Sequence, residues 1–156
     1  MSQTVIETDL GHIALELEAD GLVSVSRTEG PVTEGDGAHQ ALVEQIRQCI
    51  NGQRDGRDIP IVPQGSEFQQ KVWQAMRDIP PGEVRSYSEL AVMAGNPRAT
   101  RAVASACGSN PYVIVVPCHR VVRRDRGLGG FSWGLDLKRQ LLEREGVAIS
   151  ADGYIR

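Results

Sequence analysis

The sequence contains few cysteines and no long apolar run. Its 156 residues include three cysteines, Cys49, Cys107 and Cys118, an odd set in which no pair has CxxC spacing. We therefore expect no disulfide framework. We expect free thiols, which are typical of proteins in a reducing compartment. Because the sequence has neither eighteen consecutive apolar residues nor a basic-then-apolar leader, we expect no membrane span and no signal peptide. We expect a soluble, cytoplasmic protein.

The net charge is small, at −3, but it is unevenly distributed. Residues 1–65 contain 4 Lys and Arg against 11 Asp and Glu, whereas residues 66–156 contain 13 against 9. Residues 97–144 are more basic still, with 9 basic side chains against 3 acidic ones. A polyanion would meet this part of the chain first. An ordinary solvated surface remains the other interpretation.

Residues 1–65 are predicted to form a small α/β domain that ends in a linker. Hydrophobic alternation over residues 4–17 predicts a β-hairpin, and residues 23–25 predict a third strand. Residues 41–49 have the apolar spacing of a helix. Residues 51–65 are rich in Gly, Pro and Asp, which is typical of a linker.

Residues 66–156 are predicted to form a mainly helical domain. Capping boxes at Ser66 and Ser86 each predict the start of a helix. A third helix is expected from Asn96-Pro97 to Cys107, with Asn96 as cap and Pro97 in the first turn. Helix, short turn and helix is the helix-turn-helix pattern, although most such helix pairs are only structural.

The third helix combines small residues with arginines. Ala99, Ala102 and Ala106 are expected on one face, beside Arg98 and Arg101. A helix packed into its own core would more often carry Leu or Ile at such positions. The small face therefore favours close approach to a partner.

A thiol, an imidazole and a guanidinium interrupt an apolar run at Cys118, His119 and Arg120. Residues 112–116 are predicted to form a buried strand that Pro117 ends, which places Cys118 at a strand end. A free cysteine is more often a small buried apolar side chain, but a thiolate beside a base is a nucleophile. Adjacent side chains of an extended chain point apart, so contact between Cys118 and His119 requires a turn or a bridging water. Several carboxylates are available to orient the imidazole.

The stretch Pro117-Cys118-His119-Arg120-Val121 resembles the PCHRV signature of the O6-alkylguanine-DNA alkyltransferases, also called methylated-DNA–protein-cysteine methyltransferases. The resemblance covers essentially all of residues 66–146, with motifs in the family's order and spacing. Residues 1–65 resemble the family's variable α/β domain only in general form. The resemblance implies an α/β N-terminal module, a small antiparallel sheet plus helix, followed by a mainly helical, winged-helix-like domain with a helix-turn-helix.

The resemblance implies direct DNA repair, in which Cys118 irreversibly accepts the alkyl (methyl) group of O6-alkylguanine, one group per molecule. Whether O4-alkylthymine is also a substrate is open. His119 is implied to deprotonate Cys118 through an ordered water, and Glu145 to orient His119. Asn110 is implied to hold the active-site backbone, and Arg120 to have a structural role.

The resemblance also implies residues that contact the lesion and the DNA. Tyr87 would contact the flipped base and the adjoining phosphate, and Arg101 would replace the extruded nucleotide in the base stack. The guanine pocket would be lined by Val121, Phe131 and Ser132. The minor-groove face would include Arg98, Ala99 and Ala102. The implied partner is double-stranded DNA carrying O6-alkylguanine, bound in the minor groove by a monomer.

Two departures from the family pattern bear on specificity and metal content. Phe131 stands where tyrosine is frequent, and Trp133 where some relatives have a small residue, so the size of adduct that the pocket admits is open. Residues 1–65 lack the Cys/His set that binds zinc in some relatives, because they contain only Cys49, His12 and His39. We expect no metal and no cofactor.

Two other function classes compete with alkyl transfer. A non-catalytic protein that binds alkylated DNA would flip the same base but would lack the acceptor cysteine, whereas this chain has Cys118. A cysteine hydrolase acting on a small amide would need an oxyanion hole and turnover, and it would leave Arg101 and the small-residue helix face without a purpose.

Overall fold

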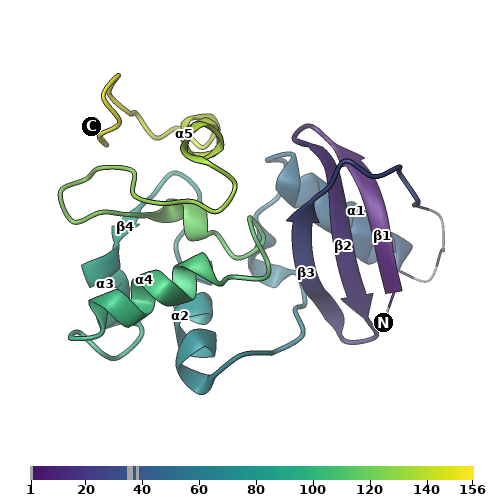
Figure 1. The fold of residues 1–156 in the computed structure, drawn as a ribbon, viewed down its shortest axis with the longest axis horizontal. Coiled ribbons are helices and arrows are strands. Elements are labelled where there is room, and N and C mark those ends of the chain that lie inside the picture. The colour runs from purple at the N-terminus through teal and green to yellow at the C-terminus, as the bar shows by residue number, and fades with distance from the viewer. Residues whose placement is uncertain (1, 35–36, 38) are drawn as a thin grey trace. The chain divides into compact units, whose positions relative to one another are not determined.

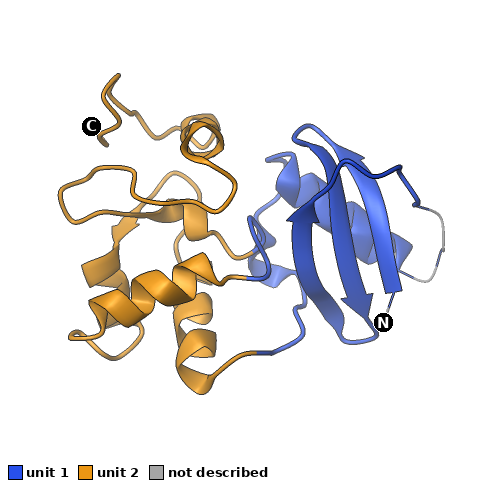
Figure 2. Cartoon of the chain, in the orientation of Figure 1, with its two compact units in different colours: residues 1–64, 111–115 blue, residues 65–110, 116–156 orange. Residues whose placement is uncertain are grey.

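The computed structural model describes residues 2–34, 37 and 39–156, which form two compact units. Unit 1 consists of residues 1–64 and 111–115, and unit 2 of residues 65–110 and 116–156 (Figure 2). Residues 111–115, expected from the sequence to belong with the C-terminal part, are therefore in unit 1.

Unit 1 is a three-stranded antiparallel sheet with one helix on it. β1 (Ser2–Thr8), β2 (Gly11–Glu18) and β3 (Gly21–Arg27) lie side by side in chain order, and α1 (Gln40–Ile50) covers one face of the sheet (Figure 1). The alternating residues of the strands and one stripe of α1 supply the core, because each element buries one face. The predicted hairpin, third strand and helix are confirmed. A short 3-10 helix, η1 (Gly56–Asp58), follows in the predicted linker.

The segment before Cys118 is buried, but it is not the strand that its composition predicted. Tyr112 makes a single parallel bridge to Val25 of β3, and the Val25 N–H donates to the Pro111 carbonyl at 2.8 Å. Ile114 then turns the chain with a φ of 74°, a conformation that a β-branched residue rarely adopts. The run is apolar because it is buried in unit 1, and its composition cannot distinguish this from a strand.

Unit 2 is built from four helices and one short parallel ladder. The helices are α2 (Glu67–Arg77), α3 (Tyr87–Met93), α4 (Thr100–Gly108) and α5 (Leu135–Arg144). β4 (Arg85–Ser86) pairs with β5 (Val121–Val122), and the 3-10 helix η2 (Cys118–Arg120) directly precedes β5. Both predicted capping boxes are confirmed, at Ser66 with Gln69 and at Ser86 with Glu89. No helix in the described part of the chain is long and apolar enough to span a membrane.

The third predicted helix differs from the structure in its start and in its exposed face. α4 begins at Thr100, because the Ala99 N–H closes a turn onto the Asn96 carbonyl at 3.0 Å and delays the helix. Ala106 is buried, and its carbonyl accepts a 2.8 Å hydrogen bond from Trp73 Nε1. The predicted alanine face is therefore wrong at Ala106, whereas Ala102 is exposed and Ala99 is half-buried.

The end of the chain packs against the loop that follows β5. The Leu128 N–H donates to the Gly153 carbonyl at 3.1 Å, and the Ile155 N–H donates to the Arg126 carbonyl at 2.9 Å. A small apolar cluster lies beneath these contacts. It consists of Leu128, Leu142 and Val147 with Val84, Ile149 and Ile155 packed against them. The cluster anchors the loop to α5 and to the C-terminal segment.

Candidate active site

A pocket of about 230 Å³ in unit 2 has Cys118 in its wall. One side of the pocket comes from α4, and the other from the loop between β5 and α5. The lining residues are Tyr87, Ala104, Cys107, Gly108, Cys118, Gly130, Phe131 and Ser132. The structure thus brings together four residues that the sequence nominated for alkyl acceptance or base binding: Cys118, Tyr87, Phe131 and Ser132.

Cys118 opens the 3-10 helix η2 instead of ending a strand. The Cys118 N–H donates to the Val116 carbonyl at 2.8 Å, and the Arg120 N–H donates to the Pro117 carbonyl at 3.0 Å. Asn110 Nδ2 donates to the same Val116 carbonyl at 2.9 Å, and the Asn110 side chain also hydrogen-bonds to the Cys118 thiol. Burial raises the pKa of Cys118, although Asn110 and the charge of Lys138 oppose this. The resting group is therefore a thiol that needs a base before it can react.

Glu145, at the end of α5, connects the two residues that follow the cysteine. Its Oε2 lies 3.1 Å from His119 Nε2 and 2.8 Å from an Arg120 guanidinium nitrogen, while Oε1 accepts from Arg120 Nε at 3.0 Å. Burial alone would raise the pKa of Glu145, but the hydrogen bonds from His119 and Arg120 prevail and lower it to about 2. Arg120 also donates to the Ile79 carbonyl at 2.7 Å. Among the several carboxylates that the sequence left as candidates to orient His119, the structure places Glu145 in contact with it.

His119 is almost fully buried, at 1% exposure, and its two ring nitrogens have different surroundings. Because the ionised Glu145 can only accept, the hydrogen must lie on Nε2. Nδ1 is then the basic nitrogen, and it is buried with no hydrogen-bond partner among the described residues. Burial lowers the pKa of His119 despite its contact with Glu145. The imidazole is therefore neutral at pH 7 and able to accept a proton on Nδ1.

Tyr87 and Phe131 supply the aromatic part of the pocket. Burial raises the pKa of the Tyr87 hydroxyl, with the nearby Cys107 and Cys118 adding to the effect. Tyr87 therefore keeps its proton at neutral pH and can donate it in a hydrogen bond. Phe131 meets the His119 ring edge to face at a centroid distance of 6.5 Å. Gly129, with a φ of 73°, brings the loop backbone so close to Tyr87 that a Cβ there would lie 3.1 Å from the hydroxyl oxygen.

Lys138 is a buried residue of the site that sequence reasoning did not single out. Its Nζ donates to the Val121 carbonyl at 2.7 Å and to the Gly130 carbonyl at 3.0 Å, which fastens the pocket loop to β5. Burial lowers the pKa of Lys138 to about 8, against the opposing influence of Cys118 and Cys107. Its position in the sequence could have indicated that it is buried. Lys138 precedes Leu141 by three residues and Leu142 by four, so it lies on the apolar stripe of α5.

Cys107 is a second thiol in the pocket wall that was not predicted there. It lies in α4, with its Sγ 3.7 Å from Met76 Sδ. Burial, and then the neighbouring Cys118, raise the pKa of Cys107 to about 12. It is therefore inert as a nucleophile at neutral pH.

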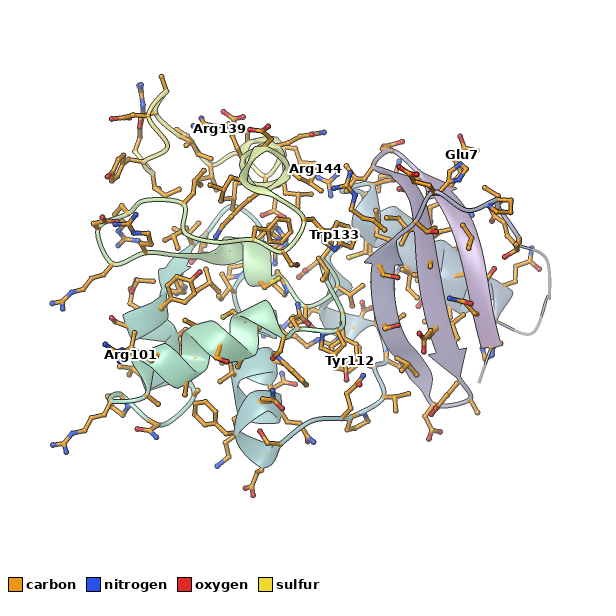
Figure 3. The ribbon with its side chains drawn as sticks, viewed as in Figure 1. Glu7, Arg101, Tyr112, Trp133, Arg139 and Arg144 are labelled. Carbon is orange, nitrogen blue, oxygen red and sulfur yellow. The ribbon has the colours of Figure 1, made fainter. Side chains whose placement is uncertain are left out.

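The remaining residues nominated for base and DNA binding are not in the pocket lining. Val121 is fully buried in β5 and is not among the pocket residues, and its carbonyl is occupied by Lys138. Arg101 and Ala102 are exposed at the start of α4, and Arg98 is exposed in the turn before it. Figure 3 shows Arg101 on α4. In the described residues, no group of three or more His, Cys, Asp or Glu side chains could hold a metal ion.

Comparison with known proteins identifies the family. Residues 67–147 match the family model described as 6-O-methylguanine DNA methyltransferase, DNA binding domain. The methylated-DNA–protein-cysteine methyltransferase of Methanosarcina acetivorans is 36% identical over 94% of this chain and 99% of its own length. The crystal structure of Mycobacterium tuberculosis OGT in complex with DNA has a TM-score of 0.80 at 37% identity, covering 92% of this chain and 91% of that one.

A further relative is longer than this chain. The regulatory protein ada of Salmonella typhimurium is 51% identical over 110 residues, which are 70% of this chain but only 31% of that protein. The chain therefore spans about a third of the length of this relative. The match to the family model and the similarity to the Methanosarcina protein nevertheless extend through Cys118, His119 and Glu145. The chain belongs to the methylated-DNA–protein-cysteine methyltransferase family.

Proposed function

We propose that this protein repairs DNA directly, by moving the alkyl group of O6-alkylguanine onto Cys118 in a single, irreversible step. The observation that carries the proposal is the placement of the Cys118 thiol in a pocket wall, with the adjacent His119 held in one tautomer by Glu145. This is the nucleophile, base and orienting group that an activated cysteine requires.

The directions of the pKa shifts of Cys118 and His119 support the following proton movements. The neutral His119 accepts the thiol proton on Nδ1, directly or through a water molecule, and Glu145 stabilises the imidazolium that forms. The Cys118 thiolate then attacks the alkyl carbon, so that a carbon–sulfur bond forms while the bond between that carbon and guanine O6 breaks. The electron pair of the broken bond stays on guanine, where a hydrogen bond from the Tyr87 hydroxyl helps to neutralise it. No group in the site hydrolyses the thioether product, so the protein reacts once.

Recognition of the lesion requires the base to leave the helix, because a side chain cannot reach O6 of a stacked and paired guanine. We propose that α3 and α4 form a helix-turn-helix in a winged-helix-like domain, with the exposed Arg98, Arg101 and Ala102 and the half-buried Ala99 on the minor groove. Asn110 holds the backbone before Cys118, and Val121 supports the pocket from β5. Unit 1, which residues 1–64 form together with residues 111–115, acts as a supporting domain. The protein acts on double-stranded DNA as a monomer.

A thiol in the pocket wall favours repair over simple lesion binding. A protein that only binds alkylated DNA needs the pocket and the DNA surface but not a thiol with a base. The Asn110 hydrogen bond to the thiol and the Glu145 contact with His119 support alkyl acceptance, a step that such a protein does not perform. Alkyl transfer is therefore the function that the geometry supports best.

Reaction stoichiometry tests the proposal. Mixed with excess duplex containing O6-methylguanine, the protein should remove one methyl group per molecule and stop, and mass spectrometry should locate the methyl group on Cys118. The inert Cys107 and the buried Cys49 serve as internal controls. Cys118→Ser should still bind the duplex but remove nothing. Turnover beyond one equivalent, or methyl on another residue, would contradict the mechanism.

A further inference from the structure

A short loop leads into Cys118, and its ends are joined by a hydrogen bond. The chain leaves unit 2 after Asn110, contributes residues 111–115 to unit 1 and returns to unit 2 at Val116 (Figure 2). These five residues are here called the strap. Asn110 Nδ2 donates to the Val116 carbonyl at 2.9 Å, which joins the residues on either side of the strap. The strap is therefore a closed loop that begins and ends beside the nucleophile.

The Val116 carbonyl connects the strap to the site. Besides the bond from Asn110, it accepts from the Cys118 N–H at 2.8 Å. This second bond closes an inverse γ-turn at Pro117, which has a φ of −82° and a ψ of 68°. The Asn110 side chain also hydrogen-bonds to the Cys118 thiol. The direction of the Val116 carbonyl therefore sets the positions of both the Cys118 backbone and the Asn110 amide.

Ile114, two residues before Val116, has a left-handed backbone with a φ of 74°. This conformation costs energy in any residue with a Cβ, and most in a β-branched one. Rotation of Ile114 to a negative φ would relieve the strain, but it would redirect the chain that follows, including the Val116 carbonyl. Strain of this kind persists only where the surroundings enforce it, and it is concentrated at functional sites.

Contacts within unit 1 hold the strap on both sides of Ile114. Before it, the fully buried Tyr112 donates its hydroxyl hydrogen to the Val62 carbonyl (Figure 3). After it, the backbone of η1 packs closely on Val115, since a Cβ on Gly56 would lie only 2.6 Å from the Val115 carbonyl oxygen. The Ile114 side chain is itself buried. Ile114 is thus held in its strained conformation by its own packing and by the packing of its neighbours.

We propose that Ile114 is a positioning residue for alkyl transfer. Its enforced left-handed turn directs the Val116 carbonyl toward Asn110 and toward the Cys118 N–H, and these hydrogen bonds place the thiol. The Tyr112 hydroxyl and the buried isoleucine side chain hold the strained turn in place. The inference rests on the proposed function for the reaction that the thiol performs.

Two substitutions at Ile114 separate the backbone conformation from the side chain. Both remove the packing, but alanine relaxes out of the left-handed region, whereas glycine adopts it without strain. Ile114→Ala should slow the limiting single-turnover rate on saturating methylated duplex by about ten- to a hundredfold, the cost of a small misplacement of a reacting group. Ile114→Gly, although it removes more of the residue, should react faster than Ile114→Ala and unfold at a higher urea concentration.

Ile6 of β1 supplies the matched control, because it is the same residue type, fully buried in the same unit, on a strand. Here the order of stability should be reversed, with Ile6→Gly unfolding at less urea than Ile6→Ala. Both folded variants should keep the limiting rate. Tyr112→Phe is a milder change that keeps the buried ring and removes only the hydroxyl, and it should slow transfer in a fully folded protein. An unchanged rate in Tyr112→Phe would overturn the proposal even where neither Ile114 variant folds.

Reaction of the thiol with iodoacetamide separates this proposal from the proposed function, because it needs no DNA. Burial raises the pKa of Cys118, and the Asn110 hydrogen bond opposes this. The pH profile of alkylation at Cys118, followed by mass spectrometry, should therefore move to higher pH in Ile114→Ala than in Ile114→Gly. Equal profiles and equal transfer rates in these two variants, or a glycine variant slower than the alanine variant, would overturn the positioning role. Absence of methyl transfer by the unmodified chain would instead overturn the proposed function, and the iodoacetamide profiles would still decide whether Ile114 positions the thiol.

Discussion

At the scale of single residues, Glu145 serves two hydrogen-bonding partners at once. One carboxylate accepts from Arg120, which also binds the Ile79 carbonyl, and contacts His119, which lies beside the nucleophile. The hydrogen bonds from Arg120 hold the carboxylate in place. The carboxylate in turn fixes the orientation of the imidazole and keeps the hydrogen on Nε2, so Nδ1 stays basic. Arg120, for which the family resemblance implied a structural role, thus anchors the carboxylate that contacts His119.

The role of His119 can be tested by its pH dependence. His119→Ala should slow transfer from methylated duplex by about a hundredfold or more, the usual contribution of a positioned base, with little change in DNA affinity. Because burial lowers the pKa of His119 below its usual value, the rate of the unmodified protein should be constant near pH 7. It should fall only when acid protonates the ring, and this acid limb should vanish in the variant.

His12 offers a matched control, since it lies in β2 of unit 1 with its Nδ1 hydrogen-bonded to the Gly30 carbonyl. His12→Gln should leave both the rate and the pH profile unchanged. Unaltered kinetics in a folded His119→Ala protein would remove this residue from the mechanism.

At the scale of secondary-structure elements, the sequence predicts well wherever local chemistry decides the structure. The capping boxes at Ser66 and Ser86 located two helix starts, because each box is complete within four residues. The strand predicted at residues 112–116 was wrong because residues 112–115 are packed in unit 1, and their conformation depends on this packing and not on local pattern. Ala106 was misplaced because only tertiary packing reveals its contact with Trp73.

The site residues, too, could be predicted where adjacent residues identify them, but not where the contact forms only in the folded protein. Cys118 and His119 could be nominated from adjacent residue types. Glu145 lies 26 residues beyond His119 and was identified only by resemblance to a family, since several carboxylates fitted the local chemistry. Lys138 and Cys107 were missed because a lysine or a cysteine in an amphipathic helix carries no signal of what it faces in the folded protein.

The exposed Arg101 on α4 provides a test at the scale of this element. Arg101→Ala should impair repair of O6-methylguanine in duplex DNA far more than transfer from the free base, because only in the duplex must the vacated stack be filled. The ratio of the two single-turnover rates is the measurement. Equal losses on both substrates would place Arg101 in the pocket or in the fold. Lys71→Gln supplies the control, because Lys71 is an exposed cation of the same unit that pairs with Glu67 on α2.

At the scale of the whole molecule, the proposed reaction changes the protein as well as the DNA. Cys118, the proposed methyl acceptor, is only 7% exposed, and its thiol is hydrogen-bonded by Asn110. An added methyl group must fit into packed surroundings, and the Asn110 amide loses a partner. The proposed transfer would therefore move the damage from the nucleic acid to a packed part of unit 2.

The methylated protein should consequently be less stable, by about 1–3 kcal/mol, from overpacking and the lost hydrogen bond. The measurement is the urea midpoint before and after reaction with one equivalent of methylated duplex, with the DNA removed. Cys118→Ser treated in the same way should show no change, which controls for the handling. An unchanged midpoint in fully methylated protein would mean that the pocket accommodates the adduct without strain.

The double use of the Glu145 carboxylate restricts how a descendant of this protein could lose its activity. A mutation at Glu145 would disable His119 and would also remove the carboxylate that pairs with the buried Arg120. Because loss of one partner of a buried ion pair destabilises the fold, selection for a folded protein would eliminate such a mutation. A mutation of Cys118 to another small residue leaves that ion pair, the pocket and the surface of α4 intact. A single codon change, at Cys118, could therefore produce a descendant that recognises alkylated DNA without being consumed by the reaction.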